Sequence, residues 1–157
     1  MDRKNLMPEK KSILITGGTG LVGSHAAAYL QERGEKVVVF DVALNERQLA
    51  LVGIQDKVTA VRGDILDFPF FLETLQKYNV GRVAHLAAYI GEEVDRRPFA
   101  GFQVSLMGTA RVLEAARLLK LDRVVLGSSG TVCYGNIKEW GSRPVHGHFP
   151  DSQGTGV

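Results

Sequence analysis

Residues 12–23 read Ser-Ile-Leu-Ile-Thr-Gly-Gly-Thr-Gly-Leu-Val-Gly, and this stretch decides the fold. Its apolar start, Ile13–Thr16, has the length and composition of a short buried strand. Its second half has glycines in the spacing G-x-x-G-x-x-G, at Gly17, Gly20 and Gly23. In a chain with 18 glycines this spacing alone is a weak signal. Because it lies between a predicted strand and a predicted helix, Leu21–Arg33, it indicates a dinucleotide-binding turn.

Each glycine of this turn has a physical role. Gly17 allows a tight exit from the strand, Gly20 lets the backbone approach a pyrophosphate, and Gly23 lets the helix pack against the sheet. The amides around Leu21 and Val22 would point at the phosphates from a helix N-terminus, where the helix dipole favours negative charge. A tight turn that binds no ligand is the structural alternative.

Strands and helices alternate along the rest of the chain. Further strands are predicted at Lys36–Phe40, Lys57–Arg62, Arg82–Leu86 and Arg123–Leu126. Further helices are predicted at Glu46–Val52, at Asp67–Tyr78 with Asp67 as N-cap, and at Phe99–Leu119 with Pro98 at its start. Repeated strand–helix–strand units form right-handed crossovers. We therefore predict an α/β fold, a doubly wound parallel sheet of the Rossmann type with strand order 3-2-1-4-5, incomplete at the C-terminus.

Composition divides the chain into three expected segments. Residues 1–11 form a basic tail, residues 12–135 the nucleotide-binding domain, and residues 136–157 an irregular, polar, glycine-rich active-site loop. The net charge of +2 and the short basic run give no case for a nucleic-acid partner. The single cysteine, Cys133, excludes an internal disulfide and an all-cysteine metal site. No signal peptide or apolar stretch of about 20 residues is present, so we expect a cytoplasmic protein with no membrane partner.

An acidic residue follows the second predicted strand. Asp41 comes 18 residues after Gly23, where a carboxylate can accept hydrogen bonds from both ribose hydroxyls of an adenosine. The same charge repels the extra phosphate of NADP, so the pattern favours NAD as cofactor over NADP. Arg47 is near enough in sequence to leave NADP open. The structural alternative for Asp41 is a turn or cap residue.

Five motifs in this order resemble the extended short-chain dehydrogenase/reductase family, in its NAD-dependent epimerase/dehydratase branch. They are residues 16–23 (TGGTGLVG), 63–67 (GDILD), 83–88 (VAHLAA), Gly108-Thr109 followed by 113–117 (LEAAR), and 128–132 (SSGTV). The resemblance runs from about residue 12 to the end of the chain. It implies the same Rossmann fold and NAD as cofactor.

The resemblance also implies site residues. Asp64 would accept a hydrogen bond from the adenine amino group, with Ile65 beside the ring; the alternative for Asp64 is a helix cap, a role that Asp67 fills better. Three residues after the fourth strand would line the cofactor, unless they serve only sheet packing: Leu86, Ala87 and Ala88.

Ser129 matches the family's catalytic serine, whose hydroxyl hydrogen-bonds the reacting substrate oxygen. Ser128 is one residue away and leaves the register open, so we place it with the cofactor site. The family commonly has asparagine where this chain has Ser105, which could hold a water molecule there. Cys133 is expected to be a small packed residue and not a nucleophile.

In the family, a tyrosine with a lysine four residues later provides the general base for hydride transfer to NAD. Residues 142–157 resemble the loop before that helix. We therefore expect the intact parent to be an enzyme that acts on a small-molecule substrate, a nucleotide sugar. Because the tyrosine and lysine are missing from these 157 residues, we expect them to be inactive alone. A non-catalytic dinucleotide-binding module or sensor is the alternative, and a homodimer of the parent is left open.

Other polar residues have simpler interpretations. His85 lies among apolar residues and is expected to be a hydrogen-bonded core histidine. His146 and His148 offer too few ligands for a metal, so no metal site is predicted. Residues 92–97 are expected to form a loop bordering the ligand crevice, where Arg96 or Arg97 could contact a sugar or phosphate.

Overall fold

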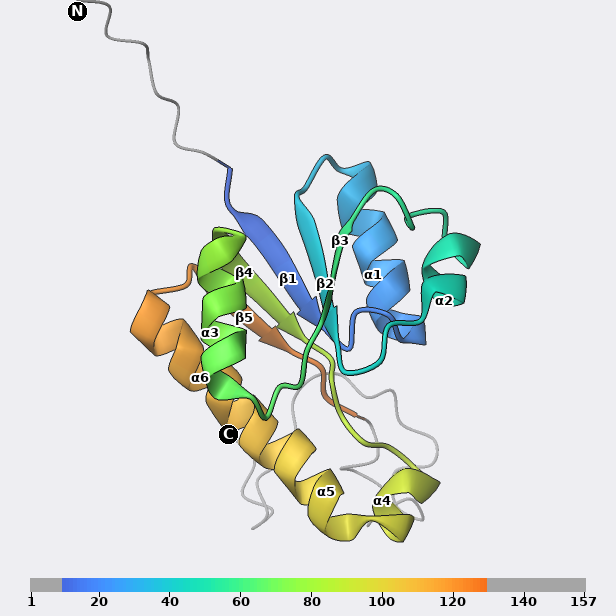
Figure 1. Cartoon of the computed structure of the whole chain (residues 1–157), viewed down its shortest axis with the longest axis vertical. Helices are drawn as coiled ribbons and strands as arrows, with labels where there is room; N and C mark the ends of the chain where they lie inside the picture. Colours follow the sequence, from blue (N-terminus) through green and yellow to red (C-terminus); the bar gives the residue numbers. More distant parts are fainter. Residues whose placement is uncertain (1–9, 130–157) are drawn as a thin grey trace, which may run out of the picture. The chain divides into compact units, whose positions relative to one another are not determined.

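A computed structural model describes residues 10–129 of the chain. They contain one parallel five-stranded sheet in the order β3-β2-β1-β4-β5, as predicted (Figure 1). The strands are β1 (Ser12–Thr16), β2 (Val37–Asp41), β3 (Thr59–Arg62), β4 (Val80–His85) and β5 (Arg123–Leu126). All four strand pairings are parallel, and Thr16 at the end of β1 lies opposite Phe40 on β2 and His85 on β4. The carboxyl ends of the central strands therefore meet at one edge of the sheet.

Helices cover both faces of the sheet. On one face lie α1 (Leu21–Glu32) and α2 (Glu46–Leu51), and on the other lie α3 (Phe68–Lys77) and α6 (Gly108–Leu119) (Figure 1). Three short elements come between β4 and α6: α4 (Glu92–Arg96), α5 (Pro98–Phe102) and the π-helical turn η1 (Gln103–Met107). Among the described residues, no helix is long and apolar enough to cross a membrane.

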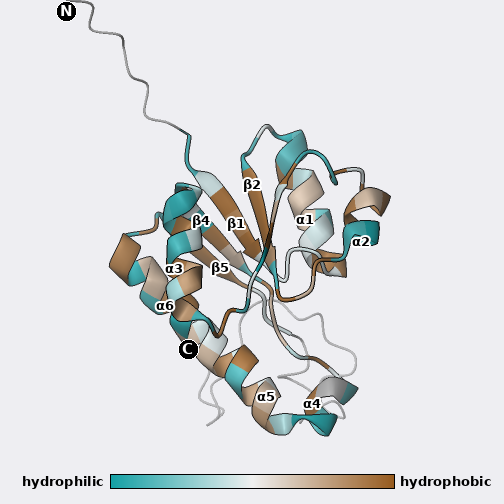
Figure 2. Cartoon of the chain, in the orientation of Figure 1, coloured by the Kyte–Doolittle hydropathy of each residue, from teal (hydrophilic) through white to brown (hydrophobic). Residues whose placement is uncertain are grey.

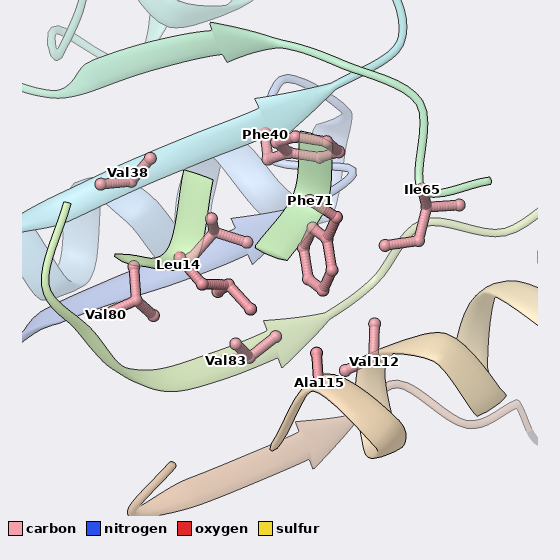
Figure 3. Packing of buried hydrophobic residues seen from close by; sticks show 10 residues of the cluster. Leu14, Val38, Phe40, Ile65, Phe71, Val80, Val83, Val112 and Ala115 are labelled. Atoms are coloured by element: carbon pink, nitrogen blue, oxygen red, sulfur yellow. The ribbon is translucent and has the colours of Figure 1, made fainter. Parts of the chain in front are cut away.

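The core has two halves, one on each face of the sheet. Leu14, Val38 and Val83, from three neighbouring strands, point toward Phe71 of α3 and Val112 of α6 (Figure 3). On the opposite face, alternate residues of β1 and β2 pack against α1 and α2. Side chains of a strand alternate between its two faces, so a strand covered on both faces is apolar along its length. The central strands are accordingly hydrophobic in Figure 2, whereas the helices also carry hydrophilic stretches.

The sequence interpretation was wrong about the segment between β4 and α6. Residues 92–96, predicted as loop, form the one-turn helix α4, in which Arg96 pairs with Glu92 at 2.9 Å. The helix predicted over Phe99–Leu119 is interrupted by η1. Periodicity predicts that a segment is helical but does not detect the one extra residue of a π turn. Such turns concentrate at functional sites.

Asp67 caps α3, as predicted, because its carboxylate accepts a hydrogen bond from the amide of Phe70 at 3.1 Å. We expect Asp67→Ala to lower the free energy of unfolding by about 1 kcal/mol, since an amide of the first helical turn loses its partner. Urea denaturation measures this loss, and Asp67→Asn, which keeps an acceptor oxygen, is the matched control. Equal stability of the alanine variant and the wild type would contradict the capping role.

Candidate cofactor cleft

A cleft of about 490 Å³ opens at the carboxyl edge of the sheet. Its lining comes from the turn after β1, the start of α1, the ends of β2, β3 and β4 with the residues that follow them, and η1. It consists of Gly17, Gly20, Leu21, Val22, Gly23, Phe40, Asp41, Val42, Gly63, Asp64, Ile65, Leu86, Ala87, Ala88, Tyr89, Ile90 and Val104. Of the residues predicted for the cofactor up to Gly127, all lie there except Ser105. Ligands of open α/β sheets bind in this position, outside the carboxyl ends of the strands.

The glycine turn is shaped by close backbone approach. Gly17 has a φ of 65°, and a Cβ on it would lie 2.9 Å from the amide nitrogen of Ala87. A Cβ on Gly23 would meet the carbonyl oxygen of Gly17 and would lie 2.8 Å from the Cα of Gly18. At Gly20 the contact would be looser, 3.3 Å from the same Gly17 carbonyl. The turn is therefore a tightly folded cradle at the start of α1.

The first-turn amides of α1 can donate hydrogen bonds to an anion. Its N-cap is Gly20, which has no side chain that could cap the helix. The first-turn amides of a helix have no partner within the helix. Leu21 and Val22, the first two helical residues, are 69% and 66% exposed. The apolar side chains near the start of this helix thus face away from the core, and its buried residues are the small Gly23, Ser24 and Ala27.

Asp41 is held against the glycine turn. Its Oδ2 accepts hydrogen bonds from the backbone amide of Thr19 at 3.1 Å and from the Thr19 hydroxyl at 2.8 Å. Thr19 itself is 1% exposed. The carboxylate that would hold a ribose and the turn that would hold a diphosphate are therefore joined directly. Arg47, the residue that left NADP open, is exposed on α2 and does not line the cleft.

Asp64 and Ile65 lie at the end of β3. Asp64 accepts a hydrogen bond from the amide of Leu66 at 2.8 Å, two residues on, and α3 is capped by Asp67. The alternative in which Asp64 caps that helix is therefore wrong. Ile65 is 5% exposed and belongs to the core around Phe71. Ile65 therefore belongs both to the cleft lining and to the hydrophobic core behind it.

His85 is a hydrogen-bonded core histidine, as predicted. It is 5% exposed, its Nδ1 lies 2.7 Å from the hydroxyl of Thr16, and its Nε2 lies 3.1 Å from the hydroxyl of Thr109. Burial lowers the pKa of His85, because desolvation disfavours the charged ring.

This lowered pKa predicts acid sensitivity. Below the ordinary histidine pKa of about 6.5, the unfolded chain binds a proton that the folded chain does not. Stability is therefore lost as pH falls from about 6.5 toward the native pKa of His85. The pKa of Glu35 is also lowered, chiefly by its hydrogen bond from Lys10. Its contribution to stability is lost only as pH falls below the usual glutamate value of 4.5, outside the range that reports on His85. Urea titrations between pH 7.5 and 5, at roughly half-unit steps, measure the slope. His85→Gln should flatten it, and an unchanged slope would contradict this assignment.

The three predicted serines have different outcomes. Ser105 is exposed on η1 and does not line the cleft, although its neighbour Val104 does. Ser128 and Ser129 belong to the second compact unit of the chain, Ser128–Val157, and their roles stay predictions. Cys133, His146, His148 and the expected boundary at residue 135 lie outside the described residues. Among residues 10–129, no group of three or more histidine, cysteine or acidic side chains could hold a metal ion.

Sequence reasoning missed several residues of the site. Thr19 is a variable position of the glycine pattern, and only its hydroxyl could have suggested a partner for Asp41. The sequence gave no signal for five apolar residues of the cleft wall, because they read as ordinary strand, loop or helix residues: Phe40, Val42, Tyr89, Ile90 and Val104. Gly63 is explained by a ring: its Cβ would lie 2.5 Å from the Cζ of Phe40.

Residues 13–152 match the sequence profile of the NAD dependent epimerase/dehydratase family. The chain belongs to this family. It is 34% identical over 127 residues to the UDP-glucose 4-epimerase of Yersinia enterocolitica, covering 77% of this chain and 38% of that protein. It is 31% identical over 130 residues to a Klebsiella pneumoniae UDP-glucose 4-epimerase, covering 79% of this chain and 92% of that sequence.

Solved epimerase structures have the same fold. A UDP-glucose 4-epimerase from Stenotrophomonas maltophila, with bound NAD and formylated UDP-arabinopyranose, superposes with a TM-score of 0.71 at 30% identity, covering 78% of this chain and 38% of that one. The Brucella ovis enzyme in complex with NAD gives 0.65 at 32% identity, covering 76% and 36%. This epimerase/dehydratase-family chain thus spans well under half the length of these two structures.

Proposed function

We propose that the cleft binds NAD, and that the chain provides the nucleotide-binding part of an epimerase or dehydratase that oxidises a hydroxyl-bearing carbon of a nucleotide sugar. The observation that carries the proposal is that a glycine turn at a helix N-terminus and a carboxylate are hydrogen-bonded to each other. The N-cap of α1 is a glycine without a capping side chain, and the Thr19 hydroxyl of the turn lies 2.8 Å from Oδ2 of Asp41. The family match and the NAD-bound relatives support the same assignment.

The residues fit a dinucleotide in size and charge. Gly17 and Gly23 allow the turn to fold tightly, because a Cβ on either would meet backbone atoms of the protein itself. Gly20, whose Cβ would have only one contact within 4 Å, is the position at which the bare backbone could approach a diphosphate. Asp41 would accept hydrogen bonds from the adenosine ribose, and Asp64 from the adenine amino group. Leu86, Ala87 and Ala88 would form an apolar wall that excludes water. When bound, NAD supplies the hydride acceptor.

Ser129 would donate a hydrogen bond to the reacting oxygen of the substrate and stabilise the charge that develops there. In the sequence, Gly127 and Ser128 separate it from the end of β5. Ser129→Ala would then lower turnover of UDP-glucose by the complete enzyme while leaving NAD affinity unchanged. A folded protein that binds NAD but turns over no nucleotide sugar would favour the non-catalytic binding module.

Calorimetric titration with NAD and NADP tests the proposal. We expect saturable NAD binding and at least tenfold weaker NADP binding, a difference of about 1.4 kcal/mol, because Asp41 repels the 2′-phosphate. A folded sample that binds neither dinucleotide at millimolar concentration would overturn the proposed function. Tighter binding of NADP would overturn the role of Asp41 alone.

A further inference from the structure

A network of hydrogen bonds connects β1, β4 and α6, and its first, buried half joins β1 to β4. The hydroxyl of Thr16 lies 2.7 Å from Nδ1 of His85. The same hydroxyl oxygen accepts the backbone amides of Leu86 at 3.2 Å and Ala87 at 3.3 Å. Thr16 is completely buried. The amide of Leu86 also donates to the carbonyl oxygen of Thr16 at 3.1 Å, so Thr16 holds the backbone after β4 through both its main chain and its side chain, and it holds Ala87 through the hydroxyl.

The second half joins β4 to the helical segment. Nε2 of His85 lies 3.1 Å from the hydroxyl of Thr109 on α6, and that hydroxyl donates to the carbonyl oxygen of Ser105 at 2.6 Å. Ser105 belongs to the π turn η1. A break in regular helical hydrogen bonding is thus fastened to the same histidine that contacts Thr16.

Only one arrangement of protons gives every hydrogen bond of this network one donor and one acceptor. A carbonyl oxygen only accepts, so the single hydroxyl proton of Thr109 is committed to Ser105, and Thr109 must accept from Nε2–H of His85. A neutral ring protonated at Nε2 has an unprotonated Nδ1, which accepts the hydroxyl proton of Thr16. The oxygen of Thr16 is then left to accept two amides. A charged ring would present a third donor to Thr16 and leave its hydroxyl proton without this acceptor.

We propose that His85, held as the neutral Nε2–H tautomer, is a positioning residue that couples the floor of the cleft at Leu86 and Ala87 to the π turn at Ser105. It does not line the cleft, and it acts through Thr16 and Thr109. Burial, which lowers the pKa of His85, agrees with a neutral ring. The effect on cofactor affinity rests on the proposed function, whereas the coupling itself does not.

Thr109 provides the sharper test, because replacing the buried His85 could disrupt folding. Thr109 is half-buried on α6. Thr109→Val keeps the shape but removes the hydroxyl, which leaves Nε2–H of His85 without an acceptor. Thr109→Ser keeps the hydroxyl and is the matched control. Amide hydrogen exchange of the unliganded protein is measured at Ala87, which lies 22 residues from the substitution, with the core amide of Val83 as internal reference.

We expect Thr109→Val to accelerate exchange at Ala87 about tenfold relative to Val83, since an unsatisfied buried donor makes the ring shift away from Thr16. Thr109→Ser should exchange like the wild type. Nitrogen NMR of the wild-type imidazole should show a proton on Nε2 only. The coupling is overturned by equal exchange in the valine and serine variants, or by a ring protonated on Nδ1 at neutral pH.

Titration with NAD separates this inference from the proposed function. If the wild type binds NAD, Thr109→Val should weaken binding about fivefold and Thr109→Ser should not. If Thr109→Val changes the exchange at Ala87 but not the NAD affinity, the inference that His85 positions the cleft floor for the cofactor is overturned. If the wild type does not bind NAD, the proposed function fails, and the exchange and NMR results still decide the coupling.

Discussion

Gly23→Ala is expected to lower NAD affinity by about 10- to 100-fold and to destabilise the folded chain by about 1–3 kcal/mol. A methyl group at this position meets the carbonyl oxygen of Gly17 and would lie 2.8 Å from the Cα of Gly18. Both neighbours are backbone atoms and cannot rotate away. Elsewhere in a helix, alanine is more favourable than glycine by about 1 kcal/mol. A loss of stability therefore measures the contact and not helix propensity.

Two glycine variants serve as controls for Gly23→Ala. Gly20→Ala meets only the Gly17 carbonyl, at 3.3 Å, so it should weaken NAD binding with little loss of stability. Gly34→Asn, at a φ of 73° with open space around the Cβ, should preserve both, because asparagine tolerates this conformation. Calorimetry gives the affinities and urea denaturation the stabilities. A Gly23→Ala protein with wild-type values of both would refute the packing role.

Asp41→Asn is expected to weaken NAD binding about tenfold and to narrow the preference for NAD over NADP by a similar factor. Charge-assisted hydrogen bonds contribute about 1.5–3 kcal/mol, and neutral asparagine makes weaker ones to a ribose. Asparagine keeps an oxygen that can accept from Thr19, so the glycine turn should stay in place. The loss then reports the charge of Asp41 and not the fold of the turn.

Thr19→Val isolates the other half of this arrangement. It removes the hydroxyl that donates to Asp41 at 2.8 Å and leaves the carboxylate and its charge. Binding of NAD should weaken while the NAD-to-NADP affinity ratio stays near the wild-type ratio. Parallel titrations of both variants with both dinucleotides provide the comparison. An unchanged ratio in Asp41→Asn would show that cofactor choice lies elsewhere.

Local sequence predicted the framework because its signals are short-range. A glycine pattern between a β-branched run and a helix, followed by alternating strands and helices, specifies a parallel sheet, since right-handed crossovers leave few orders. The predicted β5 has the observed bounds, and Asp67 caps α3 as expected. Eleven of the cleft residues were also predicted, because parallel strands bring their carboxyl ends to one edge: Gly17, Gly20, Leu21, Val22, Gly23, Asp41, Asp64, Ile65, Leu86, Ala87 and Ala88.

Sequence periodicity predicted neither the π turn η1 nor the side of α6 that is buried. Residues 98–119 read as one helix, yet η1 separates α5 from α6. The apolar residues that indicated this helix, Phe102, Leu106 and Leu113, are roughly half exposed. The buried residues of α6 are instead Gly108, Val112 and Ala115. Spacing reveals a helix, but which side faces the sheet depends on the partners available.

The amino-acid sequence by itself determined the strand order, the glycine cradle, the acid at the end of β2 and the acid after β3. These depend on backbone freedom, hydrophobic runs and chain connectivity, which are written in neighbouring residues. Only the tertiary structure decided that Thr19 holds Asp41, that His85 joins Thr16 to Thr109, and that a π turn is fastened to them. The reason is physical: a hydrogen bond between side chains 22 to 69 residues apart exists only once the sheet has placed them within 3 Å or so of one another.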